Sequence, residues 1–410
     1  MVSRCPLQKE APLPGSITVT NARIFDGEAA ELVEADIRIE DGVIAEVGRG
    51  LAGDGAILDA EHRVVTPGFI DNHFHAYGIS LNMMQMEASR TSYVAILGAR
   101  RLRRALVRGF TTVRDVAGGD IGLSRAISEG LIDSPNYYYT GPALSQTGGH
   151  GDPRDSHLDL CCCGTHGTEV VDGVDALRVA VRERLRTGAH AIKIMASGGV
   201  VSLTDPIRIP QYSAEEIRVV SEEAGRRGSY VAAHAYSPEA IVHAVTNGVR
   251  SIEHGNLLDQ ETAQVMADHG AVLVPTLVTY LAMSERGRDM GMPEVALRKN
   301  AEVLAAGKNA IELATGAGVL VGFGSDLMGD LEVEQLRGLQ AQHEVQGTLE
   351  LLRSLTSGNA RILGVDHVGS IRAGAIGDLV VLARDPFVHP DALWLESERR
   401  VVVKSGVLVG

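Results

Sequence analysis

The stretch GFIDNHFHAYG, residues 68–78, places His73 and His75 one residue apart, directly after a short apolar run. In a β-strand, residues two apart point to the same face, so both imidazoles can converge on one point beyond the strand's end. Such a pair suits a metal ion. A pair of surface or hydrogen-bonded histidines is the alternative, and the spacing alone does not decide between them.

Four more polar residues stand in apolar segments, where an unpartnered polar side chain is costly: Lys193 in HAIKIMA, His234 in YVAAHAY, His254 in VRSIEHG and Asp326 in VLVGFGSD. Each has a structural explanation when taken singly, such as a buried ion pair, a core histidine or a helix cap. Together with the first pair, they offer four imidazoles and a carboxylate, a set that suits zinc or a similar divalent ion. A lysine ammonium cannot ligate a metal, but its nitrogen can take up CO2 and form a carbamate whose two oxygens could bridge two ions.

The elements that must position these residues alternate between short apolar strands and helices. Helices are expected at residues 175–188, 213–228, 237–248 and 259–270, several of which begin at Ser or Asp and end at Gly. The expected strands are VVTPGFID, FTTVRDV, NYYYTG, HAIKIMA, YVAAHAY, VRSIEHG, AVLVPT and VLVGFGSD. Eight such units predict an α/β fold with a (β/α)8 TIM barrel, in which the C-terminal strand ends meet at one site. An open doubly wound sheet is the alternative, but no G-x-G-x-x-G follows the first strand.

The two ends of the chain share a different pattern. Short alternating segments separated by D-G pairs occupy residues 16–67, and the same style returns in GDLVVLARDPF and RRVVVKSGVLVG. We therefore expect the ends to form one small β-sandwich domain. The predicted boundaries are 1–66 for its N-terminal part, 67–364 for the metal-dependent barrel and 365–410 for its C-terminal part.

The composition excludes several classes of function. A formal net charge of −14 over 410 residues argues against a nucleic-acid groove or an anionic membrane surface. No apolar stretch approaches the ~20 residues of a membrane span, and the N-terminus lacks the apolar core of a signal peptide, which favours a cytoplasmic protein. Cys5 and the run Cys161, Cys162 and Cys163 lack the spacing of a zinc ribbon and are expected to be reduced.

The set H-x-H, Lys, His, His and Asp on eight strands resembles the amidohydrolase superfamily, and the flanking β segments resemble its small β-sandwich. The strings YTGPALSQTGGHGDPR, KIMASGGVVSLTDP, AAHAYS and SIEHGNLL are similar to its prolidase-like branch. That branch contains metal-dependent Xaa-Pro and Xaa-Lys/Arg dipeptidases and ochratoxin-type amidases. The resemblance covers about Ile17 to Val409.

The resemblance implies a binuclear zinc-type amide hydrolase. One ion would be held by His73, His75 and Asp326, the second by His234 and His254, with carboxylated Lys193 bridging them. Metal-bound hydroxide would attack the amide carbonyl, and Asp326 would carry its proton to the leaving amine. The substrate would be a small molecule, a dipeptide or N-acyl amino acid cleaved next to its free α-carboxylate, as in a carboxypeptidase. The family also implies a homo-oligomer.

Two further residues are candidates for substrate contact. Tyr236 lies two residues after His234 and faces the same side, so its phenol could donate to the carbonyl oxygen or to its tetrahedral successor. His150 lies in the glycine-rich loop TGGHGDPR, where by resemblance it would bind the α-carboxylate of the departing residue. A packed rim tyrosine and an exposed loop histidine are the structural alternatives.

Other functions remain open at this point. A mononuclear deaminase or cyclic-amide hydrolase on the same scaffold is disfavoured by Lys193 and by Ser237, which stands where many deaminases have Glu. A catalytically inactive assembly protein is disfavoured because all six ligands are present. The sequence does not identify the leaving amino acid: acidic Asp205 and Asp330 could favour Lys or Arg, and an aromatic group is equally open.

Overall fold

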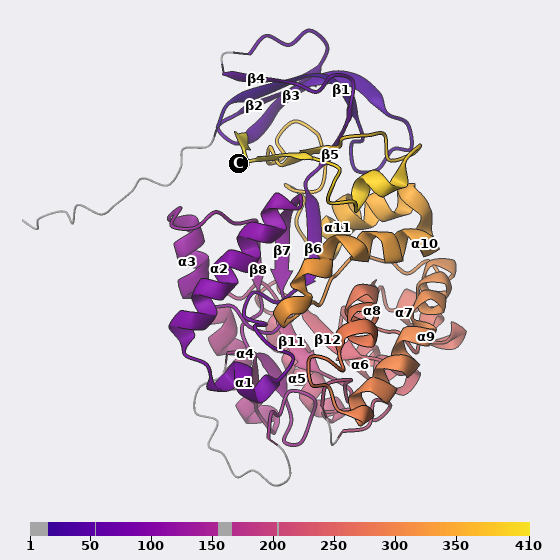
Figure 1. The fold of residues 1–410 in the computed structure, drawn as a ribbon. Helices are drawn as coiled ribbons and strands as arrows, with labels where there is room; N and C mark the ends of the chain where they lie inside the picture. The colour runs from indigo at the N-terminus through magenta and orange to yellow at the C-terminus, as the bar shows by residue number, and fades with distance from the viewer. Residues whose placement is uncertain (1–14, 54, 155–165, 203–204) are drawn as a thin grey trace, which may run out of the picture.

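The computed structural model describes residues 15–53, 55–154, 166–202 and 205–410. The N-terminal arm, Cys5 and the run Cys161, Cys162 and Cys163 lie outside these residues. The described chain forms a barrel of strands and helices, and a sheet built from both ends of the chain lies at the top of the view in Figure 1.

Both ends of the chain contribute to one eight-stranded sheet, in the order β17-β16-β15-β5-β1-β2-β3 with β4 paired to β1. Its strands are β1 (Ile17–Ile24), β2 (Val33–Glu40), β3 (Val43–Gly48), β4 (Ala56–Asp59), β5 (Val64–Pro67), β15 (Leu379–Val381), β16 (Val401–Lys404) and β17 (Val407–Leu408). The ends meet where β15 pairs antiparallel with β5, so that Val381 lies opposite Val65. This joining confirms the small β unit made by both ends, whereas its boundaries at 66/67 and 364/365 stay predictions.

Seven parallel strands surround the barrel axis: β6 (Phe69–Phe74), β7 (Phe110–Asp115), β8 (Asn136–Tyr139), β11 (Ile192–Met195), β12 (Val231–Ala235), β13 (Ser251–His254) and β14 (Val272–Val274). His190 N, two residues before β11, donates to Tyr139 O of β8 (2.8 Å), and residues 143–145 pair parallel with β11. Residues 320–326 take the eighth position. They bond to β14 through Gly322 N and Leu273 O (2.8 Å), and to β6 through Asp326 N and His73 O (2.7 Å). These bonds close the ring and confirm the predicted α/β barrel.

The eighth position is less regular than the sequence predicts, because Val321 alone within 320–326 is paired as a strand residue, through a bridge to Leu273. The buried side chain of Asn359 compensates. Its Nδ2 donates to Ile70 O (2.7 Å) and Phe323 O (2.9 Å), and its Oδ1 accepts from Phe323 N (3.0 Å). One amide side chain therefore satisfies backbone groups of both the first and the eighth positions.

The helices that cover the barrel are α1 (Met83–Ala88), α2 (Thr91–Val107), α3 (Ile121–Ser128), α4 (Val174–Arg186), α5 (Ala214–Gly225), α6 (Pro238–Thr246), α7 (Gln260–Asp268), α8 (Leu277–Arg286), α9 (Glu294–Gly316), α10 (Gln335–Arg353) and α11 (Asn359–Leu363). Caps expected from the sequence are present, since Ser213 forms a capping box with Glu216 and Asp259 accepts from Thr262 N.

The short strands β9 (Ala143–Ser145) and β10 (Thr168–Val170) were not predicted. Among the described residues, no helix combines the length and the apolar character that crossing a membrane requires.

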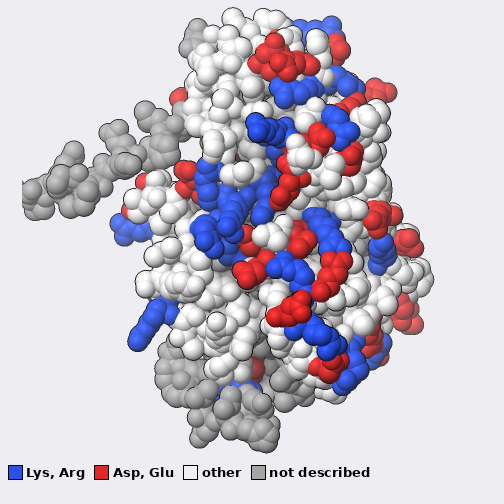
Figure 2. Space-filling model, viewed as in Figure 1, with Lys and Arg blue, Asp and Glu red and all other residues white. Residues whose placement is uncertain are grey.

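On the face shown in Figure 2, basic side chains gather over α2, and basic and acidic side chains alternate toward α10. The arginines there pair with neighbouring carboxylates, as Arg104 does with Glu332 and Arg337 with Glu285. Part of the positive charge on this face is thus neutralised by ion pairs.

Candidate active site

Six polar side chains meet in one pocket at the C-terminal ends of the barrel strands, as the sequence predicts. The residues are His73, His75, Lys193, His234, His254 and Asp326. All lie on five barrel positions, namely β6 and the residue after it, β11, β12, β13 and the eighth segment. Five of the six are buried, and Asp326 is half-buried.

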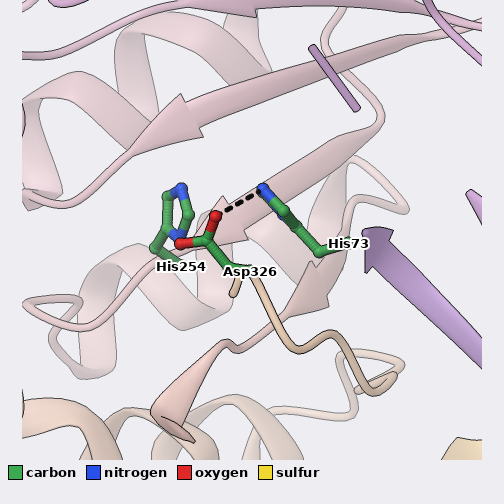
Figure 3. A group of neighbouring side chains, drawn as sticks. All are labelled: His73, His254 and Asp326. Atoms are coloured by element: carbon green, nitrogen blue, oxygen red, sulfur yellow. Dashed lines mark ion pairs between the residues drawn. The ribbon is translucent and has the colours of Figure 1, made fainter. Parts of the chain in front are cut away.

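The carboxylate of Asp326 lies between imidazoles. Figure 3 shows it between the rings of His73 and His254, at 3.4 Å from His73 Nε2 and 3.7 Å from His254 Nδ1. His75 Nε2 lies 2.8 Å from Asp326 Oδ1, the same oxygen that faces His73, whereas His254 faces Oδ2. One ligand atom each from His73, His254 and Asp326 fits within 4.8 Å, so this group could hold a metal ion. The ring of His254 is also 4.6 Å from that of His234. His254 therefore lies between His234 and the pair formed by His73 and Asp326.

Burial sets the charge state of the histidines. Desolvation lowers the pKa of His73, His234 and His254 well below its usual value. These imidazoles are therefore neutral at physiological pH and keep the lone pair that metal ligation needs.

Lys193 is the most unusual member of the group. Its side chain is fully enclosed on β11, and among the described residues Nζ has no hydrogen-bond partner. Burial lowers the pKa of Lys193 to about 8. A buried amine with no partner is costly, and this residue therefore fits a site that is completed by another charged group.

The backbone holds two of the six residues in an uncommon conformation. His254 has φ +74° and Asp326 has φ +52°, in the left-handed region that residues other than glycine adopt uncommonly. The carboxylate of Asp71 helps to hold the second of these, since Oδ1 accepts from Ser325 N (3.0 Å) and from His73 N (3.1 Å). Strain at such positions is typical of functional sites.

Glu253 and Arg114 form a layer below the pocket that the sequence did not predict. Glu253 Oε2 lies 2.7 Å from His73 Nδ1, and the same carboxylate accepts two bonds from Arg114 Nη2, at 2.7 and 2.9 Å. Arg114 Nε also donates to Asn72 O (2.6 Å). A carboxylate on the far nitrogen fixes the orientation and tautomer of an imidazole, so His73 is aimed at the pocket with Nε2. The sequence contained one indication of this pair, because Arg114 and Glu253 are charged residues within the apolar strands FTTVRDV and SIEHG.

Replacing Arg114 with methionine is expected to lower the free energy of unfolding by about 3–5 kcal/mol, because it leaves the fully buried carboxylate of Glu253 without its cation. Denaturant unfolding of the purified variant measures this. The double variant Arg114→Met/Glu253→Gln removes both charges and should recover most of the loss. A loss under about 1 kcal/mol, the size of an exposed ion pair, would contradict the argument.

Tyr236 and His150 both line the pocket, in agreement with the positions expected for them. The Tyr236 hydroxyl lies 2.9 Å from that of Tyr280, and its ring stacks on His254 at 5.2 Å. The ring of His150 stacks on His234 at 4.2 Å, and its Nδ1 lies 2.8 Å from Ser202 Oγ. Neither side chain is exposed, so the structural alternative of a solvated loop histidine is wrong for His150.

Lys299 on α9 holds the loop that carries Ser202. Its Nζ donates to the carbonyl oxygens of Gly199 (2.9 Å), Ser202 (2.7 Å) and Asp205 (2.8 Å). A Cβ at Gly199 would come within 2.0 Å of the His150 ring, so this close approach requires glycine. The loop and His150 are thus packed as one unit.

The acidic residues considered for leaving-group recognition do not line the pocket. Asp205 is buried and accepts from Gln211 Nε2 (3.1 Å), and Asp330 is exposed on the short helix Gly329–Glu334. Tyr280 and Met328, in contrast, are part of the pocket wall. Arg208 pairs with Glu302 (2.8 Å) and Arg154 with Asp152 (2.6 Å).

Comparisons with known proteins agree with this geometry. Residues 64–410 match the family model described as the Amidohydrolase family. Ochratoxinase of Aspergillus niger is 31% identical over 418 residues, which cover 94% of this chain and 85% of the relative. A prolidase crystallised in complex with N-methylphosphonate-L-proline is 42% identical with a TM-score of 0.93, covering 96% of this chain and 99% of that one. An Xaa-Pro dipeptidase with methionine bound in its active site is 27% identical with a TM-score of 0.85, covering 96% and 99%.

Proposed function

The chain belongs to the amidohydrolase family, and we propose that it is a binuclear metal-dependent amide hydrolase that acts next to a free α-carboxylate. Membership confirms the resemblance to this superfamily and its prolidase-like branch, and indicates a hydrolase of C–N bonds. The proposed substrate is a dipeptide or an N-acyl amino acid, because similar proteins are described as prolidases, an Xaa-Pro dipeptidase and an ochratoxinase. The observation that carries the finer proposal is the convergence of the six polar side chains in one pocket.

The residues present fit two divalent ions, zinc or similar. The proposed ligands are His73, His75 and Asp326 for one ion and His234 and His254 for the other. Lys193 is proposed to bridge them as a carbamate, which would give its partnerless Nζ an anionic substituent between the two histidine groups. When bound, such ions would polarise the amide carbonyl and lower the pKa of a coordinated water.

The protein's own groups would then move the protons. Asp326, which is within hydrogen-bond distance of His75, would accept a proton from the attacking water and return it to the nitrogen as the C–N bond breaks. Tyr236 would donate its phenolic hydrogen to the oxygen that becomes negative after attack, since burial raises the pKa of this tyrosine and keeps it protonated. His150 would bind the α-carboxylate of the leaving residue beside His234, on whose ring it stacks.

The test is amino-acid release from a panel of dipeptides and N-acyl amino acids that end in Pro, Lys, Arg, Phe, Leu or Glu, with and without added zinc. We expect release of one residue class, lost on chelation and restored by metal. No release by a protein that holds two metal ions per chain would overturn the proposal and favour lactone, cyclic-amide or deaminase substrates. A chain that binds no metal and releases nothing would instead favour the assembly protein.

A further inference from the structure

Beside the six polar residues, part of the pocket wall is apolar and rich in methionine. Its members are Leu81, Met83, Met86, Val201, Met283 and Met328. Among the residues that line the pocket, the charged or ionisable ones are those already described at the strand ends, together with His150 and the two tyrosines. The part of the substrate that contacts this wall must therefore be uncharged and apolar, since a charge would be desolvated there without a partner.

A second pocket lies beside the first and shares part of its wall. Leu81, Met83 and Val201 line both, and all three are half-buried. Beyond them, the second pocket is lined by Met84, Met290, Met292, Pro293 and Ala296, with Asn82, Ser202, Asp152, Pro153, Arg154 and Gly291 completing it. Leu81, Val201, Met290 and Met292 also pack against the apolar cluster that contains Tyr236 and Tyr280. Apolar surface thus continues from the reacting centre into the second pocket.

Methionine is concentrated along this path. Of the ten methionines in the chain, all but Met1 and Met266 line one pocket or the other. Methionine side chains are flexible and polarisable, and they adapt to apolar ligands of variable shape. A wall built this way suits a flexible chain better than one rigid group.

We propose that the two pockets together bind an extended linear acyl chain, so that the preferred substrates are N-acyl amino acids with acyl groups longer than any amino-acid side chain. The chain would pass over Met83 and Val201 into the second pocket. The acyl side is favoured over the leaving side because the leaving residue is limited to the length of an amino-acid side chain. This inference rests on the proposed amide hydrolysis.

The test compares kcat/KM for one amino acid carrying acetyl, butanoyl, octanoyl or dodecanoyl groups. Each added methylene that enters the pockets should raise kcat/KM by up to roughly fourfold. Titration calorimetry with the Lys193→Ala variant measures the affinity for each member of the series in the absence of turnover. Acetyl substrate cleaved as fast as dodecanoyl, with equal binding, would overturn the inference and leave amide hydrolysis standing. If no substrate is cleaved but binding still strengthens with chain length, the proposed amide hydrolysis is wrong and the proposed binding of the acyl chain stands.

Two variants narrow the second pocket from different sides. Met84→Trp fills it from α1 and Ala296→Leu from α9. Either should abolish the gain in kcat/KM beyond butanoyl, so that the octanoyl and dodecanoyl substrates are cleaved no faster than the butanoyl one. Ile96→Trp is the matched control, since Ile96 is 71% exposed on α2 and lines neither pocket. An unchanged chain-length series in both narrowing variants would contradict the route of the acyl chain.

Discussion

Replacing Asp326 with asparagine is expected to lower kcat by roughly 10³-fold or more, even when metal is added in excess. Removal of a general base typically costs 10²–10⁴-fold, and this carboxylate also lies 3.4 Å from His73 Nε2 and 2.8 Å from His75 Nε2. Asparagine keeps the size of the side chain but cannot accept the proton of the attacking water. The measurement is kcat on the best substrate of the panel, beside metal content per chain.

The matched control is Asp330→Asn, four residues further along the chain. Asp330 is exposed, and its backbone oxygen accepts a hydrogen bond from Arg286 Nη1. Its activity should stay close to that of the wild type. Retention of more than about a tenth of the wild-type kcat by Asp326→Asn would mean that another group shuttles the proton, because a positioned general base contributes at least about 10²-fold.

The positions of the site residues were predictable because a parallel barrel imposes them. Once eight apolar strands alternate with helices, residues at the C-terminal strand ends must meet, however far apart they are in sequence. His73 and Asp326 are an example, since they lie 3.4 Å apart although the chain between them spans nearly the whole barrel. Helix starts such as Ser213 were equally predictable, because a capping box is a local signal.

Contacts made by side chains across the barrel were not predictable in this way. Arg114 and Glu253 come from β7 and β13, and nothing in either strand indicates its partner. The same holds for Asn359, whose amide replaces strand pairing at the eighth position. A periodic apolar pattern reports burial, but it does not report which buried polar groups satisfy one another.

Replacing Lys193 with methionine is expected to abolish measurable activity and to reduce bound metal from two ions per chain to one or none. The proposed bridge requires an amine that is neutral often enough to attack CO2. Burial lowers the pKa of Lys193 to about 8, so a substantial fraction is neutral near physiological pH. Attack forms an N–C bond, the carbonyl electron pair moves to oxygen, and the nitrogen releases one proton to solvent. Isotopically labelled bicarbonate should give a carbamate signal in the wild type and none in the variant.

The stability of the Lys193→Met variant distinguishes a metal-bridging role from a structural one. If Lys193 stabilised the folded protein, methionine in its place would lower the unfolding temperature. We expect the opposite in the metal-free state, because the variant removes a buried amine whose Nζ has no hydrogen-bond partner among the described residues and whose desolvation costs about 1–3 kcal/mol. Metal-free Lys193→Met should therefore unfold at a higher temperature than the metal-free wild type, whereas added zinc should stabilise the wild type more. A destabilised variant that still binds two ions would refute the bridging role.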